Sequence, residues 1–539
     1  MASEITNPQF DVIVIGAGIN GAGIARDAAM RRLKVLLLDK GDIGSGTSSW
    51  STRLIHGGLR YLEHGEVGLV RESLRERARL MNIAPHLVRP LEILVPIYKY
   101  ARRGIWTIRA GMTAYDVLSF AKTFPRHRML STAQTLRQAP GLNREGLLGA
   151  AVYFDAQVEF AERLVVENAL SALEHGASVI TCARVDKINV EGGKVRNVEF
   201  TQERRGADGP TGELHSATAR VVINAAGPWI DQVLGKAVAD PPRLIGGTKG
   251  SHLIVAPFAG ALQTAIYVEA ETDRRPFFII PWNGQYLIGT IDIRYNGDLD
   301  HVRIETDEIE YLLRETNRVM PTAKLTREQI LYTYSGVRPL PFTGDKDEQS
   351  ITRRHFIRRH PYVNNLFSIV GGKLTTYRSL AAQTVDLVLQ RLGRASAPCT
   401  TDREPLPGAD APDFEGFCKD FNERTNLPEA IRKRLLGIYG ARASEVTQLV
   451  VQDSSLDEVI DAETGAIAAE IVFAFKYELA QTLSDCLLRR TMVGLNSTCG
   501  LDAVEAAGRI AQKHLGWPED RTAQEIADYR AEISRRFRG

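Results

Sequence analysis

Three glycines near the N-terminus have the types and spacing that point most directly to chemistry. Gly16, Gly18 and Gly21 follow the apolar run 11–15 and open an Ala-rich helical pattern. In this spacing the first glycine allows a tight turn, the second lets backbone approach a pyrophosphate, and the third lets the helix pack on the strand. The phosphates then lie at the helix N-terminus. Asp39 ends a second apolar run about 20 residues later, where a carboxylate can bind a ribose hydroxyl. The sequence therefore predicts a dinucleotide site.

A second group of candidate residues lies between residues 41 and 62. The segment 41–53, GDIGSGTSSWSTR, offers hydroxyls and N–H groups that suit a phosphate or a flavin edge, although a solvated loop has the same composition. It leads into LIHGGLRYL, where His56, Arg60 and Tyr61 stand among leucines. Because a surface loop has no need of these leucines, we expect a half-buried segment whose polar side chains point inward.

Two later segments place a lone cation beside a glycine turn. Arg338 stands in YTYSGVRP among apolar and small residues, where a buried charge requires a partner. Lys373 follows a Gly-Gly pair in FSIVGGKLTTY, which predicts a strand, a turn and a helix from about Thr375. The N-terminus of that helix would face an anion. Both cations are therefore candidates for binding a negatively charged substrate.

The elements that must position these residues follow an α/β pattern. A hairpin at 188–200, centred on a Gly-Gly pair, precedes a buried return strand at 220–229. This insertion is unlike a plain nicotinamide-binding domain and favours a flavin fold. The other expected elements of this part are strands at 11–15, 35–38 and 178–181, a charged helix at 66–80 and a helix at 161–174.

The second half of the chain predicts two further kinds of structure. Short β-branched and aromatic runs between residues 251 and 293 indicate a mostly antiparallel, substrate-facing sheet. Residues 396–413 are rich in Pro, Ala and acidic residues, which is typical of a linker. Beyond them, apolar residues at four-residue steps from Ile471 to Leu487 predict one helix.

A basic and aromatic stretch occupies residues 93–115, which contain no acidic residue. Such a stretch suits an anionic lipid surface, because aromatic rings lie at headgroup depth and cations meet lipid phosphates. A solvated basic helix with its aromatics packed inward explains the same pattern. The cations are Lys99, Arg102, Arg103 and Arg109, and they alternate with Tyr98, Tyr100, Trp106 and Ile108.

Composition excludes several classes of function. The 539 residues predict about three domains, and a net charge of +2 gives no general reason to expect nucleic-acid binding. The five cysteines form no CxxC pair, so we expect neither a disulfide framework nor a metal site. The N-terminus lacks a signal-peptide pattern, and no run is apolar enough to predict a membrane span. We expect a protein of the reducing cytoplasm that can still lie on a membrane.

Seven motifs in order resemble one family. VIVIGAGINGAGIARDA, SSWSTRLIHGGLRYLEHGE, NAAGPW, GTKGSH, FIIPW, TYSGVRPL and GGKLTTYR are similar to the FAD-dependent, respiratory glycerol-3-phosphate dehydrogenases over about residues 10–390. One departure is Asp39, where glutamate is common in that family. The resemblance implies oxidation of sn-glycerol 3-phosphate to dihydroxyacetone phosphate, with electrons passing through FAD to a ubiquinone-type membrane quinone. It also implies a homodimer in the cytoplasm, peripheral on the inner face of the cytoplasmic membrane.

The implied fold is a Rossmann-type FAD-binding domain of the glutathione-reductase and D-amino-acid-oxidase kind, with an antiparallel-sheet substrate domain and an all-helical C-terminal cap. The expected boundaries are 1–80, 151–235 and 330–395 for the FAD-binding domain, 81–150 and 236–329 for the substrate and membrane-facing domain, 396–412 for the linker, and 413–539 for the cap.

The resemblance also assigns roles to individual residues. His56 is the candidate general base, because an imidazole titrates near neutral pH and can take the hydroxyl proton; His252 is a second candidate. Lys373 and Arg338 are expected to act in catalysis as well as in binding. The substrate residues are Arg60, Tyr61, His252, Arg338 and Lys373, and the FAD residues are Gly16, Gly18, Asn20, Gly21, Asp39, Thr47, Ser48, Ser49, Gly227, Trp229, Gly372 and Thr375.

Three alternatives stay open. A flavin oxidase of the same fold would hand its electrons to oxygen, and it would have no need of a membrane-facing basic patch. An amine- or amino-acid-oxidising flavoenzyme would need an arginine for a carboxylate rather than several cations for a phosphate dianion. A flavin-binding regulator would hold a cofactor that no substrate reduces.

Overall fold

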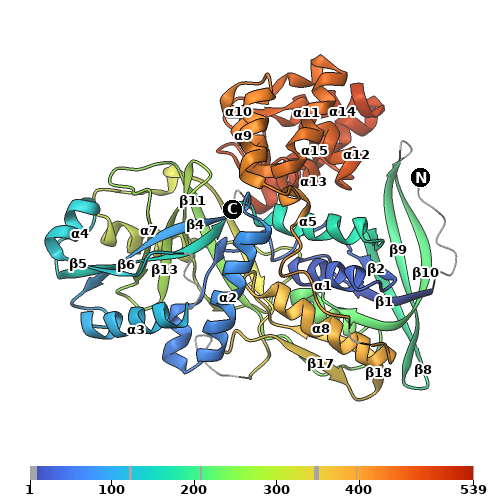
Figure 1. Cartoon of the computed structure of the whole chain (residues 1–539), viewed down its shortest axis with the longest axis horizontal. Helices are drawn as coiled ribbons and strands as arrows, with labels where there is room; N and C mark the ends of the chain where they lie inside the picture. Colours follow the sequence, from blue (N-terminus) through green and yellow to red (C-terminus); the bar gives the residue numbers. More distant parts are fainter. Residues whose placement is uncertain (1–8, 120–123, 207–208, 345–350, 396, 538–539) are drawn as a thin grey trace.

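A computed structural model describes residues 9–119, 124–206, 209–344, 351–395 and 397–537 of the chain. It contains two large sheets side by side and a group of C-terminal helices stacked above them (Figure 1). We describe the two sheets first, because the functional cavity is lined by both of them.

The first sheet is built on a parallel core. Strand β1 pairs in parallel with β2 and β10, β10 pairs with β18, and β2 pairs with β7. The buried runs of β1 and β2 are apolar, as expected for strands covered on both faces. Helices α1, α5 and α8 contact one another beside this sheet (Figure 1). The elements are β1 Gln9–Ile15, α1 Ile19–Met30, β2 Val35–Leu38, α5 Ala161–Glu174, β7 Ser178–Ile180, β10 Gly209–Asn224, α6 Ile230–Leu234, β17 Phe356–His360, β18 Val363–Val370 and α8 Tyr377–Leu392.

The predicted hairpin is present and longer than expected. Strands β8 (Ala183–Glu191) and β9 (Lys194–Gly206) meet at the Gly192–Gly193 turn, and β9 pairs in turn with the first half of β10. This arm extends away from the body of the molecule (Figure 1). The second half of β10 returns into the parallel sheet, which is why the hairpin stands before the return strand in the sequence.

The second sheet is antiparallel except for the β12–β4 pair, among the strands that the structure describes. Strand β16 adds to β11 at one end, and β5 adds to β6 at the other. The elements are β3 Leu54–Ile55, α2 Val67–Ile83, β4 Val88–Tyr98, α3 Ile105–Leu118, β5 Arg128–Ser131, α4 Thr132–Gln138, β6 Leu147–Val158, β11 Thr248–Val255, β12 Ala265–Glu269, β13 Pro276–Trp282, β14 Gln285–Gly289, β15 Ile293–Arg294, α7 Thr306–Val319 and β16 Ile330–Arg338.

Strand pairing corrects the expected domain boundaries at two places. We expected residues from 151 and from 330 onward to join the FAD-binding part. Instead β6 pairs with β4 along nearly its whole length, and β16 pairs with β11. Both strands therefore belong to the second sheet. Backbone pairing determines the sheet to which each strand belongs. An apolar run in the sequence does not show with which other strand it pairs.

The C-terminal part is mainly helical, as predicted, with a short pair of strands, β19 and β20, that was not predicted from the sequence. The helix expected from Ile471 to Leu487 is two helices. Leu479 adopts a left-handed φ of 60°, which ends α12. Thr482 then caps α13 by accepting a hydrogen bond from Asp485 N at 3.1 Å. The elements are α9 Phe414–Arg424, α10 Glu429–Tyr439, α11 Ala443–Gln452, β19 Val459–Asp461, β20 Ala466–Ile467, α12 Ala468–Tyr477, α13 Leu483–Arg489, α14 Val504–Leu515 and α15 Glu519–Phe537.

The expected linker is a packed segment in its described part. Leu406 is fully buried, and its N–H donates to Ile83 O at 2.8 Å. Gly408 N donates to the buried carboxylate of Glu167 at 3.1 Å. This segment therefore anchors the C-terminal helices to α2 and α5 instead of swinging freely. Among the described residues, none of the helices combines the length and the apolar character needed to cross a membrane.

Candidate functional site

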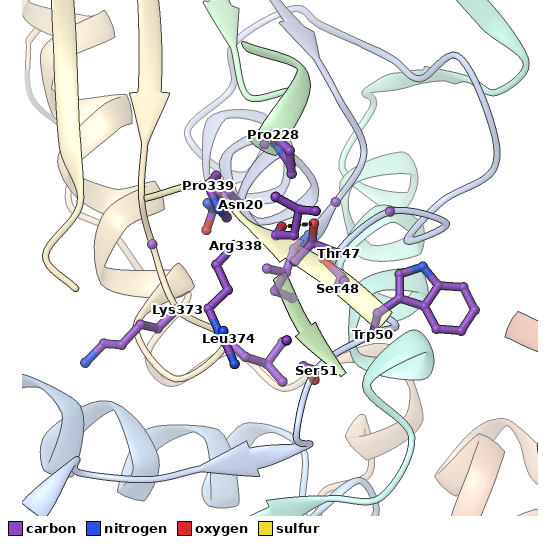
Figure 2. Close-up of a pocket in the computed structure, with 18 of the residues that line it drawn as sticks. Asn20, Thr47, Ser48, Trp50, Ser51, Pro228, Arg338, Pro339, Lys373 and Leu374 are labelled. Atoms are coloured by element: carbon purple, nitrogen blue, oxygen red, sulfur yellow. Dashed lines mark hydrogen bonds between the residues drawn. The ribbon is translucent and has the colours of Figure 1, made fainter. Parts of the chain in front are cut away.

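A cavity of about 850 Å³ is lined by residues of both sheets. One side is formed by the glycine turn after β1, the end of β2 and the loop 41–51. The lining also includes His56, His252, Arg338 and Lys373. Figure 2 shows Asn20, Thr47 and Ser48 grouped together, with Arg338 and Lys373 beside them. The residues predicted here that line the cavity are Gly16, Gly18, Asn20, Asp39, Thr47, Ser48, His56, Tyr61, Gly227, Trp229, His252, Arg338, Gly372, Lys373 and Thr375.

The dinucleotide fingerprint has the geometry that its glycines predict. Gly16 has a φ of 105°, and a Cβ there would lie 2.7 Å from Ala225 O. A Cβ on Gly21 would lie 1.8 Å from Gly16 O, so the helix can pack this closely only with glycine. Ser48 Oγ accepts a hydrogen bond from Ile19 N at 3.0 Å. The N-terminus of α1 therefore opens on the cavity, where it can face a pyrophosphate.

Asp39 ends β2 at the cavity wall. Its two carboxylate oxygens accept hydrogen bonds from Ala17 N at 2.6 Å and from Gly41 N at 2.8 Å. Burial raises the pKa of Asp39, and these two backbone donors oppose that rise. Since each carboxylate oxygen has more than one acceptor site, Asp39 can still receive a ribose hydroxyl.

Several buried polar atoms around the cavity have no hydrogen-bond partner among the described residues. They include Asn20 Oδ1, Trp229 Nε1 and His252 Nδ1. Buried polar atoms are normally paired, and here all three belong to residues that line the cavity. They therefore fit a bound group with its own donors and acceptors. Together with the glycine turn and Asp39, they suit a dinucleotide such as FAD.

Two predicted cofactor residues do not line the cavity. Gly21 packs against Gly16, and the Ser49 hydroxyl turns away to donate to Gly44 O at 2.7 Å. Direct contact of these two residues with the cofactor stays a prediction. They shape the wall on which the lining residues stand.

His56 sits on a loop that is held at two successive amides. Its own N–H donates to Thr375 Oγ1 at 3.1 Å, and Gly57 N donates to Tyr115 Oη at 2.9 Å. The Tyr115 hydroxyl in turn donates to Asp155 Oδ2 at 2.7 Å. Burial lowers the pKa of His56; Asp155 opposes this shift, whereas Lys373 and Arg77 reinforce it. The imidazole is therefore neutral near pH 7 and able to accept a proton.

His252 is less suited to take up a proton. Its Nε2 lies 3.0 Å from Thr52 Oγ1, and its ring centroid lies 4.7 Å from that of Tyr334. Burial lowers the pKa of His252 well below its usual range, and Arg338 and Arg53 add to the shift. The side chain is suited to neutral hydrogen bonding at the cavity wall.

Arg338 belongs to a cluster of three arginines around Asp292. Arg338 Nη1 lies 2.9 Å from Asp292 Oδ1, and Arg353 Nη2 lies 2.5 Å from Oδ2. Arg275 Nη1 donates to the backbone oxygen of Asp292 at 2.9 Å. Burial alone would raise the pKa of Asp292, but the two guanidinium groups hold it below its ordinary value. All four residues line the cavity.

Sequence reasoning found only Arg338 of this cluster. Arg353 and Arg275 stand in polar surroundings, and Asp292 follows a strand with nothing in its neighbours to mark it. The one available signal was the density of arginines in ITRRHFIRRH, residues 351–360, before a predicted strand. The side chain of Arg60 lies outside the part of the chain that the structure describes, so its role stays a prediction.

Lys373 also lines the cavity and lies in the turn between β18 and α8. Its Nζ donates to Ser73 Oγ at 2.7 Å and lies 4.7 Å from the ring centroid of Tyr61. Burial lowers the pKa of Lys373 to about 8, although Glu72 and Glu66 oppose the shift. The ammonium is therefore charged at pH 7 but close to its titration point.

Comparison with known proteins agrees with this geometry. The family model described as FAD dependent oxidoreductase matches residues 11–378, and that of the C-terminal domain of alpha-glycerophosphate oxidase matches residues 399–522. A glycerol-3-phosphate dehydrogenase of Synechocystis is 47% identical, over 98% of this chain and 96% of its own. An aerobic glycerol-3-phosphate dehydrogenase of Staphylococcus haemolyticus is 34% identical, over 90% and 87%.

A solved structure of the glycerol-3-phosphate dehydrogenase from Bacillus halodurans, complexed with FAD, superimposes with a TM-score of 0.78. It is 28% identical and covers 99% of this chain and 96% of its own. These findings confirm the predicted fold class, the family resemblance and FAD as the cofactor. The chain therefore belongs to the family of FAD-dependent glycerol-3-phosphate dehydrogenases.

Proposed function

We propose that this protein oxidises sn-glycerol 3-phosphate to dihydroxyacetone phosphate and passes the electrons to a membrane quinone. The observation that carries the substrate assignment is the convergence of Arg338, Arg353 and Lys373 on the cavity that also holds the dinucleotide fingerprint. A phosphate dianion suits several cations, and arginine offers two parallel donors to it. An amino-acid substrate, with its single carboxylate, would leave part of this charge unmatched.

Different residues of the chain bind the phosphate, accept the proton and stabilise charge around the reacting carbon. Bound FAD supplies the acceptor for the hydride. Arg338 and Arg353 hold the phosphate, which fixes the position of the C2 hydroxyl relative to His56. The neutral imidazole of His56 accepts the hydroxyl proton, and the amide contacts to Thr375 and Tyr115 keep it in place. Lys373 stabilises the negative charge that develops beside it in the cavity.

A second cavity supports a lipid-soluble electron acceptor. It measures about 470 Å³ and shares Leu59 and Tyr267 with the first cavity. Its walls are mainly apolar side chains of β4 and the inner face of α3, including Val95, Ile108 and Met112. A quinone ring or its isoprenoid tail needs such an apolar space beside the redox site.

Helix α3 supports contact with a lipid surface. Trp106 is 75% exposed and Val117 is 71% exposed, and Arg109 lies beside Trp106 with its guanidinium 5.8 Å from the ring centroid. The helix lies on the side of the molecule away from the C-terminal helices (Figure 1). Peripheral binding to the inner face of the cytoplasmic membrane is therefore part of the proposal. The homodimer stays a prediction.

The side chains of the basic and aromatic stretch differ in their exposure. Tyr98 is buried and stacks on Tyr100 with ring centroids 5.1 Å apart. Arg103 is half-buried and ion-paired with Glu269. Lys99, Arg102, Trp106 and Arg109 are exposed and are the candidates for lipid contact.

A glycerol-3-phosphate oxidase that uses oxygen is the second candidate, favoured by the match of residues 399–522 to a domain named for an oxidase. Both candidates share the first half of the reaction. Anaerobic addition of sn-glycerol 3-phosphate should bleach the oxidised-flavin absorbance, whereas glycerol and glycine should not. No bleaching by sn-glycerol 3-phosphate would reject the substrate assignment and leave only the FAD fold.

A further inference from the structure

The loop of residues 41–51, which we call the cofactor loop, is held at both ends by the C-terminal helices. Seven of its residues line the FAD cavity: Gly41, Ser45, Gly46, Thr47, Ser48, Trp50 and Ser51. The loop follows β2 and belongs to the FAD-binding part by sequence. Thr47 donates to Val337 O, but the contacts at Asp42 and Trp50 come from residues more than 400 positions later in the chain.

The first anchor is a buried ion cluster at Asp42. Arg489 Nε donates to Asp42 Oδ2 at 2.6 Å, and Arg490 donates to both carboxylate oxygens at 2.9 and 2.7 Å. The three side chains are at most 5% exposed. Buried charges are tolerated only when their partners are in place, so Asp42 and the end of α13 must come together for either to be buried.

The second anchor is an aromatic contact at Trp50. The Trp50 ring lies 5.5 Å from Phe537 in an edge-to-face arrangement, and Phe537 also lies 5.4 Å from Tyr332. Phe537 is 1% exposed. The end of α15 therefore braces the indole that forms part of the cavity wall, which Figure 2 shows beside Ser51.

The end of α15 also brings a charge to the cavity. Arg536 lines the cavity, with its guanidinium 5.7 Å from the Trp50 ring centroid. It pairs with Glu532 at 3.0 Å, and its side chain keeps 31% exposure. A guanidinium that lines the site of a pyrophosphate-containing cofactor can attract the negative charge of that cofactor.

We propose that the C-terminal helices form part of the FAD-binding machinery: α13 and α15 clamp the cofactor loop, and Arg536 contributes to cofactor binding. FAD binding and docking of these helices are then coupled, and the coupling acts equally in both directions. Cofactor retention is thus a role of the C-terminal part that leaves the chemistry of the substrate residues unchanged. The inference depends on FAD alone and stands even if the substrate assignment fails.

The test is the FAD dissociation constant of the apoprotein, measured by the change in flavin fluorescence on reconstitution. Phe537→Ala should raise this constant about tenfold, the effect of losing one buried aromatic contact at the wall. Arg536→Ala should raise it several-fold. Arg535→Ala changes the exposed neighbouring cation and is the matched control, which should leave the constant unchanged. If Phe537→Ala does not fold, Phe537→Leu keeps the apolar volume and loses only the ring contacts.

Hydrogen exchange of the wild-type protein supplies the reciprocal measurement. FAD should slow amide exchange in α13 and at the end of α15, because these two elements contact the cofactor loop at Asp42 and at Trp50. The proposal would be overturned if the Phe537 and Arg536 variants melt at lower temperature with an unchanged FAD constant, because the helices would then be structural only. Equal exchange in these helices with and without FAD would contradict it as well.

Discussion

Asp292 lies between Arg338 and Arg353, with its two carboxylate oxygens 2.9 and 2.5 Å from their guanidinium groups. The carboxylate holds both half-buried arginines at the cavity wall and balances part of their charge there. A substrate phosphate would bring further negative charge to the same two guanidinium groups. The arrangement therefore pre-orients the two guanidinium groups. Arg353 Nη1 has no hydrogen-bond partner among the described residues, so it can donate to an anion in the cavity.

Arg338→Ala should weaken substrate binding strongly. Loss of one hydrogen-bonded charge contact of about 1.5–3 kcal/mol corresponds to roughly a 10- to 150-fold increase in KM for sn-glycerol 3-phosphate. Steady-state kinetics with a quinone analogue as electron acceptor measures this KM. Arg327→Ala, which removes an arginine from an exposed pair with Glu310, is the control. An unchanged KM in the Arg338 variant would show that the phosphate binds elsewhere.

The pH dependence of KM should report Lys373. Its pKa is lowered to about 8 by burial, so the free enzyme loses this positive charge as the pH rises through 8. KM for the dianionic substrate should therefore rise above pH 8. Lys373→Arg keeps its charge, and its KM should stay level over the same range. A wild-type KM that is constant to pH 9.5 would remove Lys373 from the binding site.

The lowered pKa of Lys373 also makes the free energy of unfolding of the substrate-free protein depend on pH. An unfolded lysine, with a pKa of about 10.4, still binds its proton between pH 8 and 10, whereas folded Lys373 has lost it. Because the unfolded state binds more protons in this window, the contribution of Lys373 to the free energy of unfolding increases as the pH rises from about 8 to 10.

His56→Ala should slow flavin reduction by about 10²- to 10⁴-fold without emptying the cofactor site. In the wild type the rate should fall at acidic pH, because a protonated imidazole cannot accept the hydroxyl proton. Burial lowers the pKa of His56, so this fall should come below the usual histidine pKa of about 6.5. Anaerobic stopped-flow reduction at several pH values measures both effects. A normal rate in the variant would exclude His56 as the base.

Asp155→Asn is a second variant that tests whether His56 is the general base. Asp155 raises the pKa of His56 against the effect of burial, so removing its charge should move the acidic limb to still lower pH. Tyr115→Phe removes the hydroxyl that holds Gly57 and should slow reduction by about threefold to tenfold, as expected for one hydrogen bond. Tyr362→Phe, at a 78% exposed position, is the control.

Local patterns in the sequence predicted much of the fold and the nucleotide half of the site. The fingerprint from Gly16 to Asp39 was predictable because its glycines serve backbone geometry within one βα unit. The pairing of β6 and β16 was not, since a strand's partner is fixed by contacts far away in the chain. Asp292 and Arg353 were missed for the same reason, because each acquires its role only from the other.

Replacing Lys99, Arg102 and Arg109 with glutamate should release the protein from anionic vesicles. The three side chains are exposed, and each cation near an anionic surface contributes about 1 kcal/mol of binding. Arg103 stays in place because its ion pair with Glu269 supports the fold. Vesicle co-sedimentation at low and high salt is the measurement. Retained binding by the triple variant would place the lipid contact on another face.

The central claim is tested most directly by reoxidation of the reduced enzyme. The purified protein is reduced anaerobically with sn-glycerol 3-phosphate and then mixed with either a soluble quinone analogue or air-saturated buffer, while the flavin absorbance is followed. The account predicts rapid recovery with quinone and slow recovery in air. Rapid recovery in air with release of hydrogen peroxide would contradict it and identify an oxidase.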